Sequence, residues 1–393
     1  MTEIPTPDVT VIIGAYEAMP YLVKCLESVE NQTIGADRVE IVAVDDGSTD
    51  GTGEYLDEFA TRSKVRTRVV HQANSGGPGG PRNTGLELAE GRYVFFLDAD
   101  DHFGEEALER MVAMGDRART DVILGKVVGV DRGAPKSMWG ATVERADIHT
   151  SNVKFTLSAQ KLFRRELLIR HGIRFDTSMR TGEDALFTME AYLRGNGVSV
   201  VADHTCYYLV GRDDGKHITK TGNYDIRFLS AQRLMELIAA HERPGRKRDL
   251  LMVRPFATTL LPQFGHVLLR QDEDTLRHKL ELAAPLMRQY WTPGVARLFK
   301  PEDRLRLTCA ALGKGAELTE ILEFLRARRK PETVASLGRR YLALPYFRDR
   351  AAGIPDAAYE IVGPPLHRRL RRKARRLAGA VRRRLVGSGA SGG

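Results

Sequence analysis

Cysteine is scarce in this chain of 393 residues. Its three cysteines, Cys25, Cys206 and Cys309, lie far apart and form no C-x-x-C pair, so the sequence indicates neither a disulfide framework nor a zinc site. No apolar run approaches the roughly 18 residues that a membrane span needs, and the N-terminus has no basic segment followed by an apolar one. We therefore expect a reducing, cytoplasmic setting, with neither signal-peptide secretion nor integration in a membrane.

Acidic residues are absent from one segment near the C-terminus, Arg368–Arg384. This segment holds nine arginines and one lysine, and removing these ten from the 60 Lys and Arg leaves 50 against 51 Asp and Glu. The formal net charge of +9 is therefore a property of a basic tail. Apolar residues recur at helical spacing among its arginines, a pattern typical of helices that lie on anionic membranes. The pattern also suits a polyanionic polymer, nucleic acid or plain solvent.

Strand and helix patterns alternate through the first 100 residues. Apolar, β-branched runs predict strands at residues 9–13, 39–44, 66–72 and 92–97. Helical spacing follows the first three of these runs, at residues 21–32, around Leu56 and from about Arg82. Alternation of this kind predicts an α/β fold in which helices cover both faces of a mostly parallel sheet.

The pattern changes beyond about residue 225. Segments such as 228–241, 275–290 and 317–329 have helical spacing and few strand signals. We therefore expect a first domain at residues 1–225, a mainly helical region at 226–345, and a partly helical basic tail with a flexible end at 346–393.

The expected carboxyl ends of the four strands carry polar or glycine-rich residues. These strand ends are Gly14–Glu17, Asp45–Asp46, Asn74–Asn83 and Asp98–Asp101. Ligands of open α/β sheets bind beyond the carboxyl ends of the strands. The sequence thus predicts one ligand site built from four strand ends, with Tyr16 placed to stack on a sugar or a base.

Asp98 and Asp100 form a D-x-D pair at the end of the fourth strand. Residues two apart in an extended chain project to the same side, so both carboxylates can point to one place outside the sheet. Hard oxygen ligands suit Mg²⁺ or Mn²⁺, which commonly share their coordination with substrate phosphates. Acidic pairs also cap helices or lie in water, and the alignment with three other polar strand ends is what favours a metal.

Two other strand ends have both a structural and a functional interpretation. The segment "VDDGSTD" (44–50) predicts a turn and a helix cap, and its carboxylates also suit a base or a sugar. The segment "NSGGPGGPRNT" (74–84) lacks the Lys-Ser/Thr ending of a P-loop. By itself such a loop can be a phosphate cradle, a tight crossing or a disordered connection; its glycines free the backbone, and its prolines limit the movement of the loop.

The segment "TGEDALFTMEAYL" (181–193) places Glu183 and Asp184 in the first turn of an expected helix. The helix dipole favours acids at this position. Taken by themselves, these residues favour a structural role over a catalytic one.

Several segments together resemble the inverting nucleotide-sugar glycosyltransferases of family two, which have the Rossmann-like GT-A fold. The resemblance rests on "VTVIIGAYEAMPYLVKCLESVENQT", "VDDGSTD", "PRNTGLELAEGRYVFFLDADD" and "TGEDALFTMEAYLRG". Within this family, the chain resembles most particularly the wall-teichoic-acid enzymes that add N-acetylglucosamine to poly(ribitol phosphate). This narrower resemblance rests on "NSGGPGGPRN", "APKSMW", "FTLSAQKLFRRELL", "GEDALFTMEAYL" and "YYLVGRDDGKHIT". It covers roughly residues 8–225.

The resemblance implies a role for each matching position. The implied nucleotide-sugar contacts are Gly14, Tyr16, Asp46, Asn74, Arg82, Asp98 and Arg212, with Asp46 reading the uracil, Asp98 the ribose and Arg82 the phosphates. Asp100 would ligate Mn²⁺ or Mg²⁺, and His217 would be a further metal ligand. Asp184 would be the catalytic base, with Glu183 shaping the acceptor site.

The implied activity is inverting, metal-dependent transfer of N-acetylglucosamine from a UDP-sugar to a teichoic-acid-like polyol phosphate polymer. Another surface glycan or a lipid-linked acceptor is the alternative with the same donor chemistry. An inactive polyanion-binding scaffold is the alternative from a different class. For such an enzyme the basic tail is best explained by docking on the polymer or on the inner membrane face, so we expect a cytoplasmic, peripheral location. Nucleic acid is disfavoured, and the sequence leaves homo-oligomerisation open.

Overall fold

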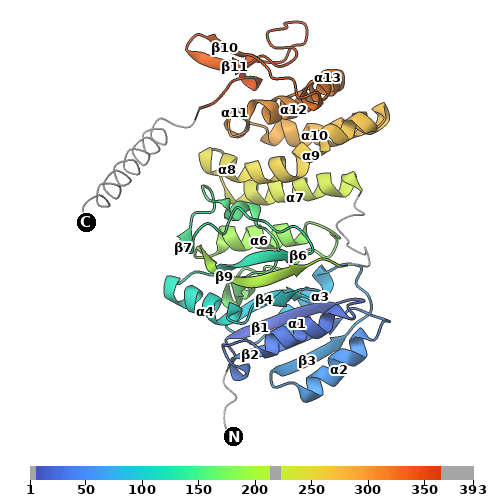
Figure 1. The fold of residues 1–393 in the computed structure, drawn as a ribbon, viewed down its shortest axis with the longest axis vertical. Helices are drawn as coiled ribbons and strands as arrows, with labels where there is room; N and C mark the ends of the chain where they lie inside the picture. The colour runs from blue at the N-terminus through green and yellow to red at the C-terminus, as the bar shows by residue number, and fades with distance from the viewer. Residues whose placement is uncertain (1–5, 213–222, 364–393) are drawn as a thin grey trace, which may run out of the picture. The chain divides into compact units, whose positions relative to one another are not determined.

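One mixed sheet dominates the first 210 residues of the protein (Figure 1). The computed structural model describes residues 6–212 and 223–363. Within these residues the sheet has nine strands, in the spatial order β3-β2-β1-β4-β8-β6-β9-β5 with β7 paired to β9. The strands are β1 (Val9–Ala15), β2 (Val39–Asp45), β3 (Arg66–His71), β4 (Tyr93–Asp98), β5 (His102–Phe103), β6 (Val122–Val130), β7 (Val143–Ala146), β8 (Leu162–Arg164) and β9 (Val198–Val210).

The parallel half of the sheet is the half that the sequence predicts. β3, β2, β1 and β4 pair in parallel and match the four expected strands. β8 runs antiparallel to both β4 and β6, and β6 pairs in parallel with β9. The α/β prediction is confirmed, although the short strands of the second half were not anticipated.

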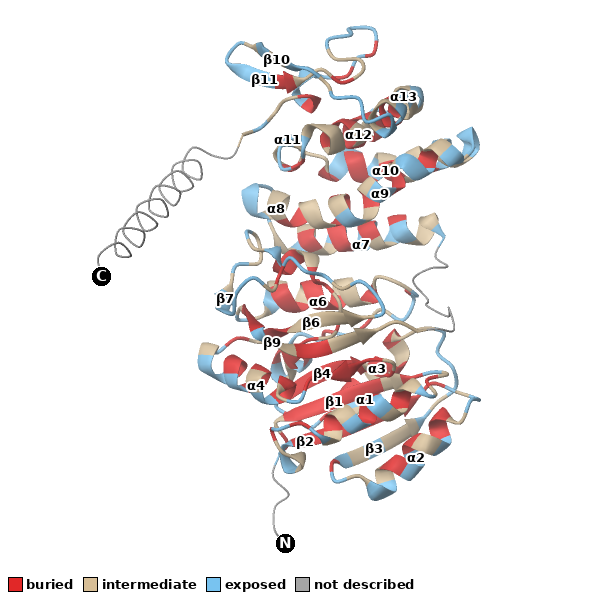
Figure 2. Cartoon of the chain, viewed as in Figure 1, coloured by how far each residue is buried: buried red, intermediate tan, exposed pale blue. Residues whose placement is uncertain are grey.

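Helices cover both faces of the sheet. They are α1 (Tyr21–Glu30), α2 (Thr52–Arg62), α3 (Gly79–Leu88), α4 (Ala107–Ala118), α5 (Arg165–Arg170) and α6 (Glu183–Arg194). Val9, Val11 and Ile13 of β1 join a core formed with α1, α2 and α4, and Figure 2 shows β1 and β4 as buried. Ile12 points to the other face, where a Cβ added at Gly85 of α3 would lie 2.4 Å from the Ile12 Cγ2 atom. A glycine at position 85 therefore lets α3 pack closely on β1.

An aromatic cluster holds α6 against β4 on this second face. The Phe96 ring meets the rings of Phe175 and Phe187 edge to face, at centroid distances of 4.9 and 5.3 Å. Phe187 lies one turn after the start of α6 and is fully buried. Such pairs add about 0.5–1.5 kcal/mol beyond the burial of their area. The cluster therefore fixes the first turn of α6 near the end of β4.

The rest of the chain is mainly helical, as expected for residues 226–345. Its helices are α7 (Tyr224–His241), α8 (Arg246–Pro255), α9 (Leu261–Gln263), α10 (Glu273–Tyr290), α11 (Pro293–Ala296), α12 (Pro301–Ala311) and α13 (Gly315–Arg326). Short 3-10 or π turns are η1 (Ala36–Arg38), η2 (Asn152–Phe155), η4 (Phe256–Leu260), η5 (His266–Arg270) and η6 (Asp356–Ala358). An unanticipated hairpin of β10 (Thr333–Ser336) and β11 (Arg339–Leu342) follows α13. No described helix is long and apolar enough to cross a membrane.

Contacts group the chain into two compact units. The first comprises Met1–Gln263 and Glu281–Val295, and the second comprises Phe264–Leu280 and Ala296–Gly393. The boundary expected at residue 225 does not coincide with this division, because α7 packs on α6 within the first unit. The basic tail of Arg368–Arg384 lies outside the described residues.

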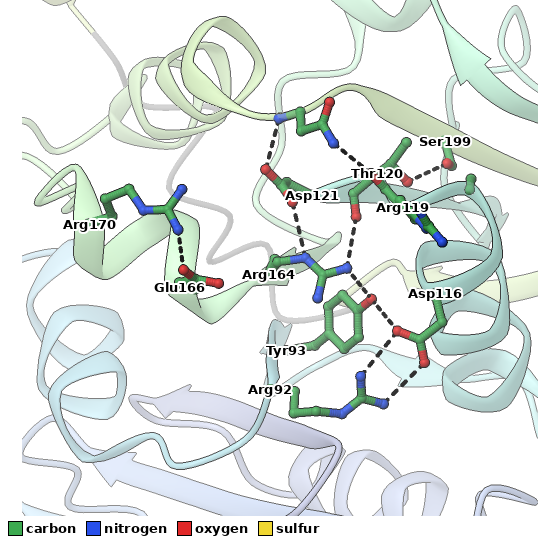
Figure 3. A network of polar contacts seen from close by, with 12 residues as sticks. Arg92, Tyr93, Asp116, Arg119, Thr120, Asp121, Arg164, Glu166, Arg170 and Ser199 are labelled. Atoms are coloured by element: carbon green, nitrogen blue, oxygen red, sulfur yellow. Dashed lines mark hydrogen bonds and ion pairs between the residues drawn. The ribbon is translucent and has the colours of Figure 1, made fainter.

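A network of charges stabilises the first unit near the amino end of β4 (Figure 3). Arg92 forms ion pairs with Asp8 and with Asp116, the latter at 3.1 Å. The Tyr93 hydroxyl donates to Asp116 at 2.8 Å and accepts from Arg164 of β8 at 2.8 Å. These contacts tie β4 to α4 and to β8, at the end of β4 opposite to Asp98.

Candidate active site

The carboxyl ends of the parallel strands meet at one edge of the sheet. The register pairs Ala15 with Asp45, Gly14 with Asp98, and Asp45 with His71. A cavity of about 800 Å³ opens at this edge. All seven residues predicted to contact the nucleotide sugar line it, namely Gly14, Tyr16, Asp46, Asn74, Arg82, Asp98 and Arg212. Asp100 lines it too, whereas His217 lies outside the described residues.

Asp46 is buried and holds the glycine-rich loop. Its carboxylate accepts hydrogen bonds from Gln72 Nε2 at 2.6 Å, from the Ser75 backbone N–H at 3.1 Å, and from the Ser75 hydroxyl at 2.9 Å. The Asn74 side chain in turn accepts from the Gly76 backbone N–H at 2.9 Å, which forms a local turn. The geometry gives Asp46 a loop-ordering role beside the uracil contact that the resemblance implies.

The turn after β2 also contains an expected side-chain bond to a backbone N–H, although the N-cap of α2 is Gly51, which has no side-chain cap. Asp50 accepts hydrogen bonds from the backbone N–H and the hydroxyl of Thr52, at 3.1 and 2.6 Å, where α2 begins. Asp45 accepts from the Ser48 N–H at 3.1 Å and from His71, whose pKa is raised by its hydrogen bonds to Asp45 and Asp57. These acids have structural roles, and Asp46 alone of the segment's acids lines the cavity.

Arg82 joins two parts of the site. Its guanidinium donates to Asp98 at 2.7 Å and to Glu183 at 3.3 Å, and it lies 5.3 Å from the centre of the Phe175 ring. Arg82 is 9% exposed, so the charges of both carboxylates are compensated in a largely dry environment. Gln160 donates to the other oxygen of Asp98. The sequence predicts Arg82 as a phosphate contact, and the structure adds its ion pairs with the two acids.

The three acids of the segment Asp98–Asp101 have different roles. Asp101 is buried and accepts hydrogen bonds from the Tyr207 hydroxyl at 2.6 Å and from the Val210 N–H at 2.7 Å, which ties β9 to this turn. Burial raises the pKa of Asp101 to about 8. Asp100 has no side-chain hydrogen bond or ion pair to the described residues. Burial and the nearby charge of Asp98 raise the pKa of Asp100, against the opposing charge of Arg212.

The donor chemistry at Asp100 fits a hard divalent cation. Asp100 lines the cavity and its carboxylate makes no hydrogen bond or ion pair with another described side chain, and Mg²⁺ and Mn²⁺ bind such oxygens. No cluster of three or more His, Cys, Asp or Glu residues suited to a metal occurs in that part of the chain. Among the described residues Asp100 is therefore the candidate protein ligand, an arrangement that suits a metal whose other ligands include substrate phosphate and water.

Glu183 and Asp184 line a second cavity of about 510 Å³. They open α6 after Gly182, whose φ of 89° favours glycine and where an added Cβ would lie 2.0 Å from the Ser230 hydroxyl. Burial and the neighbouring charge of Asp184 raise the pKa of Glu183 to about 7. Burial also raises the pKa of Asp184, against the charges of Arg82 and Lys161. The Asp184 carboxylate has no hydrogen-bond partner among the described side chains, so it is available to accept a proton.

The two cavities share four residues, which are Arg82, Asp98, Asp100 and Arg212. The second cavity also has three cations that sequence reasoning did not single out, Arg132, Lys161 and Arg254. The Lys161 ammonium is buried, donates to the Ser158 carbonyl, and has its pKa lowered to about 7 by burial. The Arg254 Nε is buried and has no hydrogen-bond partner in the described residues.

Glu17 is another residue of the first cavity, within the predicted strand end Gly14–Glu17 but without a role assigned from the sequence. Its φ is 48°, which is uncommon for a residue with a side chain. Its carbonyl accepts from Arg212 at 2.9 Å, and its carboxylate accepts from the Thr49 N–H at 2.8 Å. Gln160 and Lys161 lie in "FTLSAQKLFRRELL", a segment of the family resemblance, but no periodicity distinguishes them. Glu17 lies in a predicted strand end, but no signal there distinguished its side chain from its neighbours.

The family can be decided by comparison with known proteins. Residues 10–192 match the model of glycosyl transferase family 2, and residues 227–322 match the glycosyl transferase TarS linker domain. A poly(ribitol-phosphate) β-N-acetylglucosaminyltransferase, TarP of Staphylococcus aureus, is 35% identical over 224 residues, covering 55% of this chain and 68% of TarP. The chain belongs to glycosyl transferase family 2. The resemblance identified from the motifs is thereby confirmed.

Two further relatives of this family 2 chain place it more closely. A poly(ribitol-phosphate) β-glucosyltransferase of Bacillus spizizenii is 40% identical over 212 residues, covering 54% of this chain and 33% of that protein. The chain thus spans about a third of that relative's length. A crystal structure of S. aureus TarS residues 1–349 with UDP-GlcNAc matches with a TM-score of 0.74 and 28% identity, covering 85% of this chain and 96% of that one. This match confirms the expected GT-A fold.

Proposed function

We propose that this protein is an inverting, metal-dependent glycosyltransferase that moves N-acetylglucosamine from UDP-GlcNAc to a polyol phosphate polymer of the teichoic acid type. The observation that carries the proposal is the pair of adjoining cavities. One is lined by the expected nucleotide contacts, the other contains Asp184, and Arg82, Asp98, Asp100 and Arg212 belong to both. A donor and an acceptor placed in these cavities would meet at the shared residues.

The donor nucleotide would occupy the first cavity. Asp46 and the loop that it orders would contact the base, and Asp98, already fixed by Arg82 and Gln160, would accept from the ribose. Arg82 and Arg212 would place positive charge by the diphosphate, where negative charge grows as the leaving group departs. When bound, a divalent cation would supply Lewis-acid stabilisation there, with Asp100 as its protein ligand and His217 as a candidate second ligand.

Asp184 would act as the general base. The acceptor hydroxyl attacks the anomeric carbon on the side opposite the diphosphate, the new C–O bond forms as the bond to the diphosphate breaks, and the hydroxyl proton passes to Asp184. A raised pKa suits this role, because a base works best when its pKa lies near the operating pH. Attack from the opposite side inverts the anomeric configuration.

The acceptor would be anionic. Arg132, Lys161 and Arg254 bring positive charge to the second cavity, next to the two acids at the start of α6. The named activities of the relatives concern poly(ribitol phosphate), which has one phosphate in each repeat. Another surface glycan or a lipid-linked acceptor with the same donor chemistry is the alternative, and an inactive polyanion-binding scaffold is the alternative from a different class. The scaffold does not account for a buried Asp184 whose carboxylate has no hydrogen-bond partner among the described side chains.

The basic tail extends the proposal to location. We propose that Arg368–Arg384 docks the enzyme on the polymer or on the cytoplasmic face of an anionic membrane. Removing residues 366–393 should weaken binding to vesicles or to polymer, and unchanged binding to both would refute this role. Self-association is measured in the same samples by sedimentation.

A product assay tests the chemistry. UDP release and polymer labelling should require UDP-GlcNAc, with UDP-glucose as the competing donor, and NMR of the product should show the inverted anomer. Asp184→Asn should lower turnover at least about a hundredfold, whereas Asp274→Asn, an exposed acid in the first turn of α10, should not. Chelation should stop the reaction, Mn²⁺ should restore it, and Asp100→Asn should weaken the restoration. Equal turnover by Asp184→Asn would refute the assignment of the base.

A further inference from the structure

The hairpin of β10 and β11 ends in an unusual turn. Ser336 pairs with Arg339, so Leu337 and Gly338 alone form the connection. Both have positive φ, 47° and 73°, as in the type I′ turns that commonly join two strands. Asn-Gly is the preferred sequence for such a turn, and a leucine is rare at its first position. The backbone therefore places Leu337 in a conformation that its side chain disfavours.

Leu337 contributes no packing to the second unit. Its side chain is 99% exposed, against 61% for Val267 and 47% for Leu312, two other exposed apolar residues of the same unit. Figure 2 shows the outer end of the hairpin in the colour of exposed residues. The opposite end of the hairpin is anchored, because Tyr341 is buried and pairs with Glu360. A single exposed apolar residue is common. Leu337, however, has a strained backbone that no burial of its side chain compensates.

Cations surround this leucine in the sequence and along the hairpin. Residues 326–342 contain six Lys and Arg but one acid, Glu332. Arg328, Arg329 and Lys330 lead into β10, and Arg340 lies on β11; all four are exposed and form no ion pair with the described residues. Within the part of the chain that the structure describes, Arg339 alone of the six has a charged partner, Glu360 at 3.5 Å. The hairpin thus combines an apolar tip with uncompensated positive charge.

We propose that this hairpin docks on the surface of an anionic lipid membrane, with Leu337 entering the boundary between headgroups and acyl chains. The cations would lie at the level of the lipid phosphates, where each contributes favourably to binding. A soluble polyanion would also attract the arginines, but it offers no apolar phase to a leucine, so the tip favours a membrane over a polymer. The proposal is independent of the catalytic assignment and concerns a segment separate from Arg368–Arg384.

The test exploits the turn itself. Leu337→Asn creates the Asn-Gly pair that suits positive φ, so the hairpin should be as stable as before or more so, while the apolar tip is lost. The full chain is sedimented with vesicles of equal parts phosphatidylglycerol and phosphatidylcholine. Leu337→Asn should weaken binding about tenfold, and Arg340→Gln about fivefold. The matched control Leu312→Asn should leave binding unchanged.

Four further experiments distinguish a membrane from the other possible binding partners. Vesicles of phosphatidylcholine alone should bind the wild type weakly, and added salt should weaken its binding to anionic vesicles. Wild-type binding by Leu337→Asn would overturn the proposal. So would an equal effect of this substitution on binding to soluble polyphosphate, which would assign the hairpin to a polymer. Loss of a wild-type dimer in Leu337→Asn during sedimentation without vesicles would assign it to a second copy of the chain and would also overturn the proposal.

Discussion

The ion pair between Arg82 and Glu183 provides the sharpest physical prediction. Arg82→Met removes the cation but keeps much of the side-chain volume, and Glu183→Gln removes the anion with nearly the same shape. At 3.3 Å the two charges attract by about 5 kcal/mol in a medium of effective dielectric constant 20. Desolvation of both groups offsets much of this attraction. We expect Arg82→Met to lower the free energy of unfolding by about 3 kcal/mol, because Asp98 and Glu183 lose their shared cation.

The double variant isolates the interaction. Measured at pH 8, where Glu183 is ionised, Glu183→Gln alone should not destabilise the protein, because it removes a buried charge whose pKa is raised. The combined variant should cost about 2 kcal/mol less than the sum of the two single changes. Urea unfolding followed by tryptophan fluorescence reports on the right part of the molecule, since Trp139 and Trp291 both belong to the first unit. Additivity of the single effects to within about 0.5 kcal/mol would refute the coupling.

The pH dependence of stability gives a second readout of the same pair. Because burial raises the pKa of Glu183 from an ordinary 4.5 to about 7, the folded state holds this proton more tightly than the unfolded chain. Its stabilising contribution is complete below pH 4.5 and is lost as the pH rises through 7. Glu183→Gln should abolish this loss. Arg82→Met should extend it above pH 7, because Arg82 opposes the rise in pKa, and a wild-type pH profile in Arg82→Met would contradict the assignment.

Two further substitutions test the packing around Asp184. Burial lowers the Lys161 pKa from an ordinary 10.5 to about 7, so the charged amine destabilises the folded state fully below pH 7 and less as the pH rises toward 10.5. Lys161→Met should therefore be more stable than the wild type near pH 7, and thermal unfolding at a series of pH values should show this stability difference narrowing toward pH 10. A stability difference independent of pH would disprove this explanation. Gly182→Ala should lower the free energy of unfolding by about 1–2 kcal/mol because of its positive φ, and a similar loss in a Ser230→Ala background would separate backbone strain from the close Ser230 contact. Gly133→Ala, at a position with open space and ordinary φ, is the matched control and should be nearly neutral in the same denaturation assay.

Local sequence patterns were sufficient to predict the strands of the parallel half of the sheet. β1, β2 and β4 are buried along nearly their whole length, and such strands appear in a sequence as continuous apolar runs. Once these strands were placed, the polar residues after them had to gather at one edge. The seven expected nucleotide contacts line one cavity, six of them at or after the ends of the parallel strands and Arg212 after β9, although their binding roles stay predictions.

The remaining parts of the fold depend on contacts distant in sequence. β5 and β8 have two and three residues, too few for any periodicity to indicate. Arg82 and Glu183 are 101 residues apart, and no local sequence pattern around either residue predicts their ion pair. Lys161 looks like an ordinary surface lysine until the fold buries it. The hairpin was missed because Leu-Gly is not among the usual two-residue turn signals.

The four residues common to both cavities have a consequence for inhibitor design. A nucleotide and a polyol phosphate fragment bound on either side of Arg82, Asp98, Asp100 and Arg212 would be separated by little more than these side chains. A short tether between the two fragments would then make the second binding event intramolecular, with an effective concentration in the millimolar range. Such a tethered ligand would bind more tightly than either fragment without any additional contact, because the two cavities adjoin each other.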